Sequence, residues 1–258
     1  VDSRRKGRAD FRIEDKDEIG VKFQKKKRFK KNLEAIETLK QIEEENREAT
    51  LEEQEKLIQY VGWGGLKEAF STREDQWADE GKQVKDLLTQ EEYNSAERSL
   101  RNAHYTSPEV ISAMWDGLTE SGFKGGRILE PSVGIGHFFG MMPDSMMDSS
   151  EFDAVERDSI SARISRLLYP SSSVTHAPYQ DVPVPDEYYD LIISNVPFGQ
   201  GTVNDSFDPD LKKLKQPVHN FFFLKSLKKL REGGVAAFIT SRYKMDGKSN
   251  IREKIEEM

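Results

Sequence analysis

The sequence contains no cysteine, which excludes a disulfide framework, a thiolate metal site and a cysteine nucleophile. Its four histidines (His104, His137, His176 and His219) lie far apart without the spacing of metal ligands, so we expect no metal centre. No apolar run approaches the about 20 residues that a membrane-spanning helix needs, and no signal-peptide pattern opens the chain. We therefore expect a cytoplasmic protein with no membrane partner.

The net charge of −7 is unevenly distributed along the chain. Residues 1–31 hold 13 Lys/Arg against 6 Asp/Glu (+7), and the remainder holds 26 against 40 (−14). A basic arm on an acidic body is typical of a nucleic-acid contact. A solvated, partly disordered leader is the alternative, and composition leaves both open.

At 258 residues the chain fits one core domain with an appendage. We predict a basic, disordered leader at residues 1–20, a helical appendage at 21–103 and the core at 104–258. Apolar residues at three- and four-residue steps predict appendage helices over 21–48, from Thr50 towards Gly62, and over 84–96. Thr50 and Glu53 fit a capping box, and residues 77–81 are expected to form a loop.

Strand and helix patterns alternate through the core. Strands are predicted at 127–129, 151–156, 173–175, 189–195 and 235–240. Helices are predicted at 108–121, from about His137, at 159–169, within 212–230, and from 252 to 258. This alternation predicts an α/β fold with a parallel sheet covered on both faces.

The segment from Arg127 to Gly140 reads as a buried strand, a carboxylate, a glycine-containing turn and a helix. Gly134 and Gly136 let the backbone approach a ligand beyond the carboxyl end of the strand. The third glycine of the dinucleotide pattern is missing, and Glu130 at the strand tip would repel a pyrophosphate. An acid at this position suits a cationic ligand with an amino group, such as S-adenosylmethionine.

Polar residues also end the second and fourth predicted strands. Glu156 lies where an acid accepts hydrogen bonds from ribose hydroxyls, with Asp158 as the nearby alternative. The fourth strand ends in Asn195-Val-Pro-Phe198. The Asn195 side chain and the next backbone carbonyl can accept hydrogen bonds from a planar amine, on whose ring the Phe can stack. An ordinary strand-to-loop turn is the alternative interpretation.

In this order the motifs resemble the class I S-adenosylmethionine-dependent methyltransferases, and specifically the gamma-type N6-adenine DNA methyltransferases. Their Asn/Asp-Pro-Pro-Tyr/Phe motif corresponds to Asn195–Phe198, and the similarity extends over residues 102–252. A closer likeness, to the large methylase–helicase proteins of phages, plasmids and conjugative elements, rests on five segments: Tyr60–Gly65, Asn102–Thr106, Glu130–Gly136, Asn195–Gly199 and Thr240–Arg242.

The resemblance implies a Rossmann-like sheet, S-adenosylmethionine as cofactor, and DNA with a flipped adenine as substrate. It also implies a helicase region in the same full-length protein. The cofactor-binding residues that it implies are Tyr105, Thr106, Glu130, Ser132, Gly134, Gly136, Glu156 and Asp181. Within that set, Thr106 would lie near the methionine carboxylate and Asp181 would meet the adenine amino group. The implied catalytic residues are Asn195, Val196, Pro197 and Phe198.

Two departures from the family pattern affect these expectations. Val196 replaces the first proline of the motif, but the acceptor there is a backbone carbonyl, so the chemistry survives with a less rigid loop. The sixth and seventh strands and the target-recognition region of gamma-type enzymes are expected to be missing from this sequence.

Two other functions compete with adenine methylation of DNA. The same turn serves methylation of cytosine N4, of adenine in RNA and of glutamine in proteins. A function of a different class is a DNA-binding or assembly module of a larger protein, with a cofactor-only or inactive pocket. We favour N6-adenine methylation of DNA.

Overall fold

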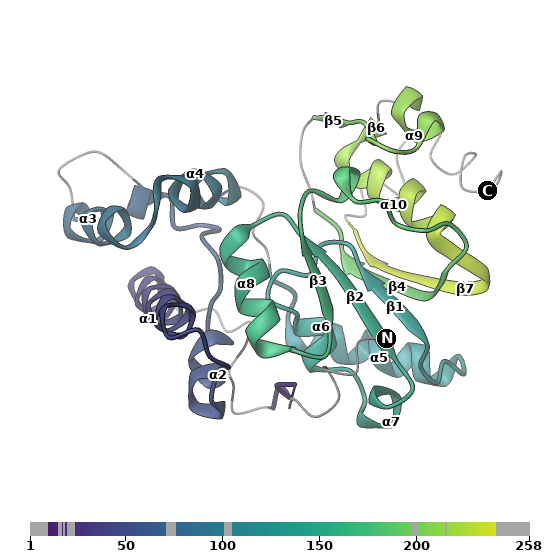
Figure 1. The fold of residues 1–258 in the computed structure, drawn as a ribbon, viewed down its shortest axis with the longest axis horizontal. Helices are drawn as coiled ribbons and strands as arrows, with labels where there is room; N and C mark the ends of the chain where they lie inside the picture. Colours follow the sequence, from purple (N-terminus) through teal and green to yellow (C-terminus); the bar gives the residue numbers. More distant parts are fainter. Residues whose placement is uncertain are drawn as a thin grey trace. The chain divides into compact units, whose positions relative to one another are not determined.

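The computed structural model describes residues 10–14, 17, 19, 24–70, 76–100, 105–197, 201–214 and 216–240 (Figure 1). The chain forms two compact units, each assembled from separate stretches of sequence. The first comprises Val1–Ser112, Gly134–Met141 and Asp158–Ser171, and the second comprises Ala113–Val133, Met142–Arg157 and Ser172–Met258. No helix in the described residues is long and apolar enough to cross a membrane.

The second unit is built on a five-stranded parallel sheet, in the order β3-β2-β1-β4-β7 (Figure 1). Its strands are β1 (Arg127–Glu130), β2 (Glu151–Glu156), β3 (Ser173–His176), β4 (Tyr189–Asn195) and β7 (Leu230–Ile239). The predicted α/β fold with a parallel sheet is therefore confirmed. The chain fills one side of β1 with β2 and β3, then crosses to β4, so the strand order reverses between β1 and β4.

Both faces of this sheet are buried, as the near-continuous apolar strands predict. On one face, Leu129, Val155 and Ile192 belong to a hydrophobic cluster with side chains of helix α10 (Val218–Lys229), including Phe221. On the other face the strand residues are equally inaccessible: Ile128, Ala154, Leu191 and Ile193. The unit also contains α7 (Asp144–Met147) and most of α5 (Pro108–Glu120).

The helix predicted within residues 212–230 is confirmed as α10, which occupies residues 218–229. Residues 209–214 form the short helix α9 (Pro209–Leu214), and a two-stranded antiparallel hairpin pairs β5 (Thr202–Val203) with β6 (Gln216–Pro217). Pro217 explains why α10 does not begin earlier, because proline lacks a backbone N–H and is tolerated at the start of a helix but not in its interior. β7 begins at Leu230, earlier than predicted, and the helix expected at 252–258 lies outside the described residues.

The first unit is helical. It contains α1 (Lys25–Glu44), α2 (Leu51–Leu57), a 3-10 helix (Lys67–Phe70), α3 (Ala78–Leu87), α4 (Gln90–Ser99), α6 (His137–Gly140) and α8 (Ser159–Leu168). Helix α8 contacts α1, α2 and α4. Arg163 on α8 forms ion pairs with Glu43 and Glu92, which tie three of these helices together. The predicted capping box of Thr50 and Glu53 is confirmed at the start of α2.

The predicted single helix over 84–96 is wrong, because α3 ends at Leu87 and α4 begins at Gln90. Leu88 is extended, and the Thr89 side chain accepts a hydrogen bond from the Glu92 amide in a second capping box. This Thr-x-x-Glu signal starts a new helix and outweighs the continuous apolar period. The expected loop at 77–81 is also wrong, because α3 starts at Ala78.

The described part of the expected leader is packed within the first unit. Phe11 is 4% exposed and donates its amide to the Leu168 carbonyl at 2.8 Å. The Ile13 amide donates to the Gly140 carbonyl at 3.1 Å.

Lysines of the basic segment are also engaged within this unit. Lys25 pairs with Glu68. Lys26 pairs with Glu80 and lies 4.2 Å from the Trp77 ring centroid. Part of the positive charge of residues 1–31 is therefore paired with acids of the first unit at the protein surface.

Candidate functional site

Three polar side chains end adjacent strands of the sheet in the second unit. The register pairs Ile128 with Leu191 and Glu130 with Ala154. Side chains alternate along a strand, so Glu130, Glu156 and Asn195 share one face of the sheet. All three lie at carboxyl ends, and β1 and β4 flank the point where the strand order reverses. Ligands of open α/β sheets bind in that crevice.

Glu130 is the most deeply buried acid of this group, with 2% of its surface exposed. Its Oε2 atom is buried and accepts no hydrogen bond from the described residues. Burial, and after it the negative charge of Glu156, raise the pKa of Glu130 well above its usual value. A hydrogen-bond donor or a cation from a ligand would satisfy this carboxyl group.

The turn after β1 is joined to the end of β4 by serine hydroxyls. Ser132 Oγ lies 2.8 Å from Ser194 Oγ and donates to the backbone carbonyl of Asn195 at 3.2 Å. Ser132, an expected cofactor residue, therefore fixes the strand end that carries the expected catalytic turn. Sequence reasoning did not identify Ser194, because a buried serine inside an apolar strand carries no motif of its own.

The expected catalytic turn is only partly described. Asn195 is half-buried at the tip of β4, Val196 is fully buried in the hydrophobic cluster, and Pro197 is half-buried. Phe198 lies outside the described residues. The Val196 side chain thus packs into the core at the position where the gamma-type motif has its first proline.

Asp181 is exposed at the end of a short 3-10 helix (Tyr179–Asp181) that follows β3. Its Oδ1 atom accepts a hydrogen bond from the hydroxyl of Ser206, and the Ser206 amide donates to the Gln180 carbonyl at 3.0 Å. The segment that follows β5 therefore holds Asp181, the residue expected to contact the adenine of the cofactor. No local sequence signal indicated this contact between Ser206 and Asp181.

The remaining expected cofactor residues belong to the first unit. Gly134 and Gly136 have φ values of +56° and +91°, which favour glycine. A Cβ atom on Gly136 would lie 2.3 Å from the Tyr169 ring, whereas one on Gly134 would lie 3.4 Å from Tyr105. The structure therefore brings Tyr105 beside the glycine turn, and Thr106 is half-buried in the next position along the chain.

His137 is a further buried polar residue of the first unit, and the sequence indicated it only as a helix start. It is 5% exposed, and neither ring nitrogen has a hydrogen-bond partner among the described residues. Its ring centroid lies 5.1 Å from that of Tyr105. Burial lowers the pKa of His137 to about 4, so its imidazole is neutral at physiological pH.

No cluster of three or more potential metal ligands occurs in the part of the chain that the structure describes. The acids at the strand tips can accept hydrogen bonds from a ligand. Ammonium and hydroxyl groups are the donors that such carboxylates accept from.

No protein-family profile matches the sequence. Among curated proteins, the chain is 30% identical over 138 residues to "Defense against restriction protein B" of Escherichia phage P1. The match covers 53% of this chain and 6% of the phage protein, so the chain corresponds to a small part of that protein's length.

The solved structures that are similar to this fold include the two that follow. The methyltransferase subunit of a type I restriction-modification system from Streptococcus thermophilus is 14% identical, with a TM-score of 0.50 over 88% of this chain and 59% of that one. A Listeria monocytogenes protein described as a class I S-adenosylmethionine-dependent methyltransferase is 13% identical, with a TM-score of 0.48 over 90% of this chain and 80% of that one.

The chain has the Rossmann-like fold of the class I S-adenosylmethionine-dependent methyltransferases, with additional N-terminal helices. The parallel order β3-β2-β1-β4-β7 and the likeness to the Streptococcus subunit establish this fold, as the sequence predicted. Identity of 14% establishes the fold alone.

Proposed function

We propose that this chain catalyses S-adenosylmethionine-dependent methylation of the N6 amino group of adenine in DNA. The observation that carries the proposal is the grouping of Glu130, Glu156 and Asn195 on one face of the sheet, at the carboxyl ends of β1, β2 and β4. This is where open α/β sheets hold ligands.

The residues present fit S-adenosylmethionine, which would supply the methyl group when bound. That molecule has a ribose diol and two cationic centres. Glu156 offers a carboxylate for the ribose hydroxyls, as expected at the tip of the second strand. Glu130 offers a buried oxygen that accepts no hydrogen bond from the described residues. Burial raises the pKa of Glu130, and a cationic ligand beside it would lower that pKa and favour the carboxylate. We assign Asp181 to the adenine amino group of the cofactor.

Asn195 and Val196 would position the substrate amine. The Asn195 side-chain oxygen and the Val196 carbonyl can each accept one N–H of the exocyclic amino group. The nitrogen would accept the methyl group as the S–C bond of the sulfonium breaks and its electron pair stays on sulfur. The two oxygens would stabilise the positive charge that develops on the nitrogen until it loses a proton to solvent. Phe198 would stack on the base, which must leave the duplex to reach the turn.

DNA is proposed as the substrate on the order of the motifs and on the proteins that this chain matches. The Streptococcus subunit is part of a restriction-modification system, and the phage protein is described as acting against restriction. The match to the phage protein is consistent with a mobile-element origin. We further propose a cytoplasmic protein of the gamma type whose full-length form includes a helicase region.

The test begins with calorimetric titration of S-adenosylmethionine into this chain, with Glu156→Ala as the matched variant. Saturable binding that the variant loses would support the assigned cofactor site. Transfer of labelled methyl groups to DNA by the full-length protein, followed by nucleoside analysis, then identifies the target. Absence of binding by folded wild-type protein, or label on cytosine, would contradict the proposal.

A DNA-binding or assembly module with an inactive pocket is the second candidate. It is favoured by the replacement of the first motif proline by Val196, whose side chain is buried in the core. Methyl transfer that Asn195→Ala abolishes, with an unchanged circular dichroism spectrum, would exclude it.

A further inference from the structure

A fully buried lysine on α10 has no role in the proposed chemistry. The side chain of Lys225 is 2% exposed, and its ion-pair partner Asp205 is 1% exposed, with Nζ and Oδ2 2.8 Å apart. Nζ also donates to the backbone carbonyls of Tyr179 at 2.8 Å and Val182 at 3.0 Å. The ammonium group therefore contacts three oxygens, two through hydrogen bonds to backbone carbonyls and one through the ion pair.

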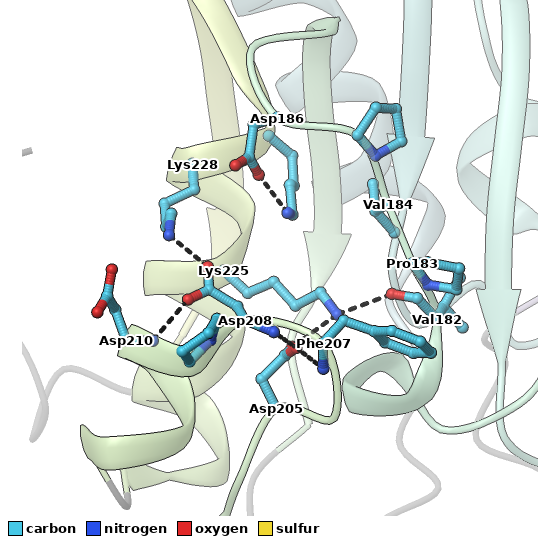
Figure 2. Close-up of a pocket in the computed structure, with 13 residues that line it drawn as sticks. Val182, Pro183, Val184, Asp186, Asp205, Phe207, Asp208, Asp210, Lys225 and Lys228 are labelled. Carbon is cyan, nitrogen blue, oxygen red and sulfur yellow. Dashed lines mark hydrogen bonds and ion pairs between the residues drawn. The ribbon is translucent and has the colours of Figure 1, made fainter.

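The acceptors of Lys225 come from the two segments that surround Asp181. The carbonyls of Tyr179 and Val182 lie on either side of Asp181 in sequence, so one ammonium group binds both ends of that short turn. Asp205 directly precedes Ser206, which hydrogen-bonds to the Asp181 side chain. Figure 2 shows the lysine extending from α10 towards Val182 and Asp205.

Asp205 also organises its own segment. Its Oδ1 atom accepts hydrogen bonds from the amides of Phe207 at 2.8 Å and Asp208 at 2.7 Å. The ion pair with Lys225 thus attaches an ordered turn to α10. It forms part of the lining of a cavity of about 440 Å³ between residues 182–186, residues 205–210 and α10 (Figure 2).

Burial of this pair is costly, because desolvation lowers the pKa of Lys225. Its pairing with Asp205, and after it the negative charge of Asp181, oppose that effect, whereas the positive charge of Lys229 adds to it. Replacing buried ion pairs by apolar residues is often neutral or stabilising. An apolar side chain would fill the same space but would leave the turn around Asp181 unattached. Stability alone therefore does not account for the lysine.

We propose that Lys225, paired with Asp205, is a positioning residue that holds Asp181 in the orientation needed to recognise the 6-amino group of the cofactor's adenine. This inference rests on the proposed function and on the role assigned to Asp181. Lys225 acts at both sides of that residue, through the backbone of its turn and through Ser206.

The test compares two ligands that differ at one position of the purine, S-adenosylhomocysteine and its 6-oxo analogue S-inosylhomocysteine. Wild-type protein prefers the adenosyl ligand, because the Asp181 carboxylate accepts a hydrogen bond from its 6-amino group. The 6-oxo group of the analogue is itself an acceptor and donates no hydrogen bond to that carboxylate. Lys225→Met reduces that preference by at least about tenfold, close to the effect of Asp181→Asn. Lys229→Met is the control: it lies one helical turn further along α10 and removes the ion pair with Asp186, and it leaves the preference unchanged.

A double variant covers the case in which Lys225→Met does not fold. Lys225→Met with Asp205→Asn removes both charges and keeps an acceptor for the amides of residues 207 and 208. A folded double variant with the wild-type ratio of dissociation constants overturns the inference while the proposed function stands. Wild-type protein that binds neither ligand overturns both, and a reduced ratio in the folded variant supports the inference.

Discussion

Two buried ionisable side chains show how single residues determine the pH response of this protein. Glu130 lies at the tip of β1 in the second unit, and His137 begins α6 in the first. Burial disfavours the charged form of each, which raises the pKa of Glu130 and lowers that of His137. The two shifts therefore have opposite effects on stability: the shift of Glu130 costs stability as pH rises, and that of His137 costs stability as pH falls.

Glu130→Gln is expected to stabilise the protein at neutral and alkaline pH. The folded-state pKa of Glu130 lies above its unfolded value. Its favourable contribution to folding stability is therefore fully present below about pH 4.5 and is lost as pH rises through the folded-state pKa. Urea denaturation from pH 4.5 to 8 measures the difference between variant and wild type. A difference that does not grow with pH would contradict the pKa shift.

His137 is expected to destabilise the folded state in acid. Its folded pKa of about 4 lies below the usual 6.5, so the unfolded chain binds the proton first as pH falls. Stability is lost between about pH 6.5 and pH 4, by about 3 kcal/mol in total. Denaturant titrations of wild type and His137→Phe over this range test the prediction. Parallel pH dependence of the two proteins would refute it.

At the scale of elements, short local signals decide where helices begin and how the glycine turn is formed. The capping boxes at Thr50 and Thr89 start α2 and α4. The first was recognised in the sequence. The second was overlooked because the apolar period continues across Leu88, which shows that a cap outweighs periodicity over one turn.

Gly136→Ala is expected to destabilise the first unit by about 2–3 kcal/mol. The residue has φ of +91°, and a Cβ atom there would lie 2.3 Å from the Tyr169 ring. Gly117→Ala is the matched control, because Gly117 lies within α5 with no atom within 4 Å of an added Cβ. The control should stabilise by about 0.5–1 kcal/mol. Thermal denaturation of both variants checks that the midpoint temperature falls for Gly136→Ala and rises for Gly117→Ala.

At the scale of the whole molecule, the distribution of charge bears on the proposed binding of DNA. Residues 1–31 carry a net charge of +7 against −14 for the rest of the chain. Lys25 and Lys26 are paired with glutamates of the first unit, so they contribute less to an external field than the formal charge implies.

Replacing Arg4, Arg5, Lys6 and Arg8 by Gln is expected to weaken DNA binding and flatten its salt dependence. Each lost phosphate contact makes the slope of log K against log salt less negative by about 0.9. Lys25→Gln with Lys26→Gln is the control, and its slope should stay close to wild type. Fluorescence anisotropy between 50 and 200 mM salt, with the full-length protein, provides the measurement. Equal slopes in all three proteins would show that the segment does not bind DNA.

Much of the core was predictable from local sequence. The five strands and their parallel arrangement follow from short apolar runs alternating with helices, because each strand must be buried on both faces. The ends of β2 and β4 were predicted to the residue, because a polar side chain stops each apolar run. Those same residues, Glu156 and Asn195, are the candidate site residues.

Other features depended on tertiary packing. The Ser132–Ser194 contact joins residues 62 positions apart, and Lys225 reaches the Tyr179 carbonyl across 46 positions. No sequence period encodes such pairs, because side chains from different elements meet only after the sheet and helices have packed. The sequence by itself determined which residues end the strands and thus the chemistry available there. The tertiary structure decided which of those residues are buried and what holds them in place.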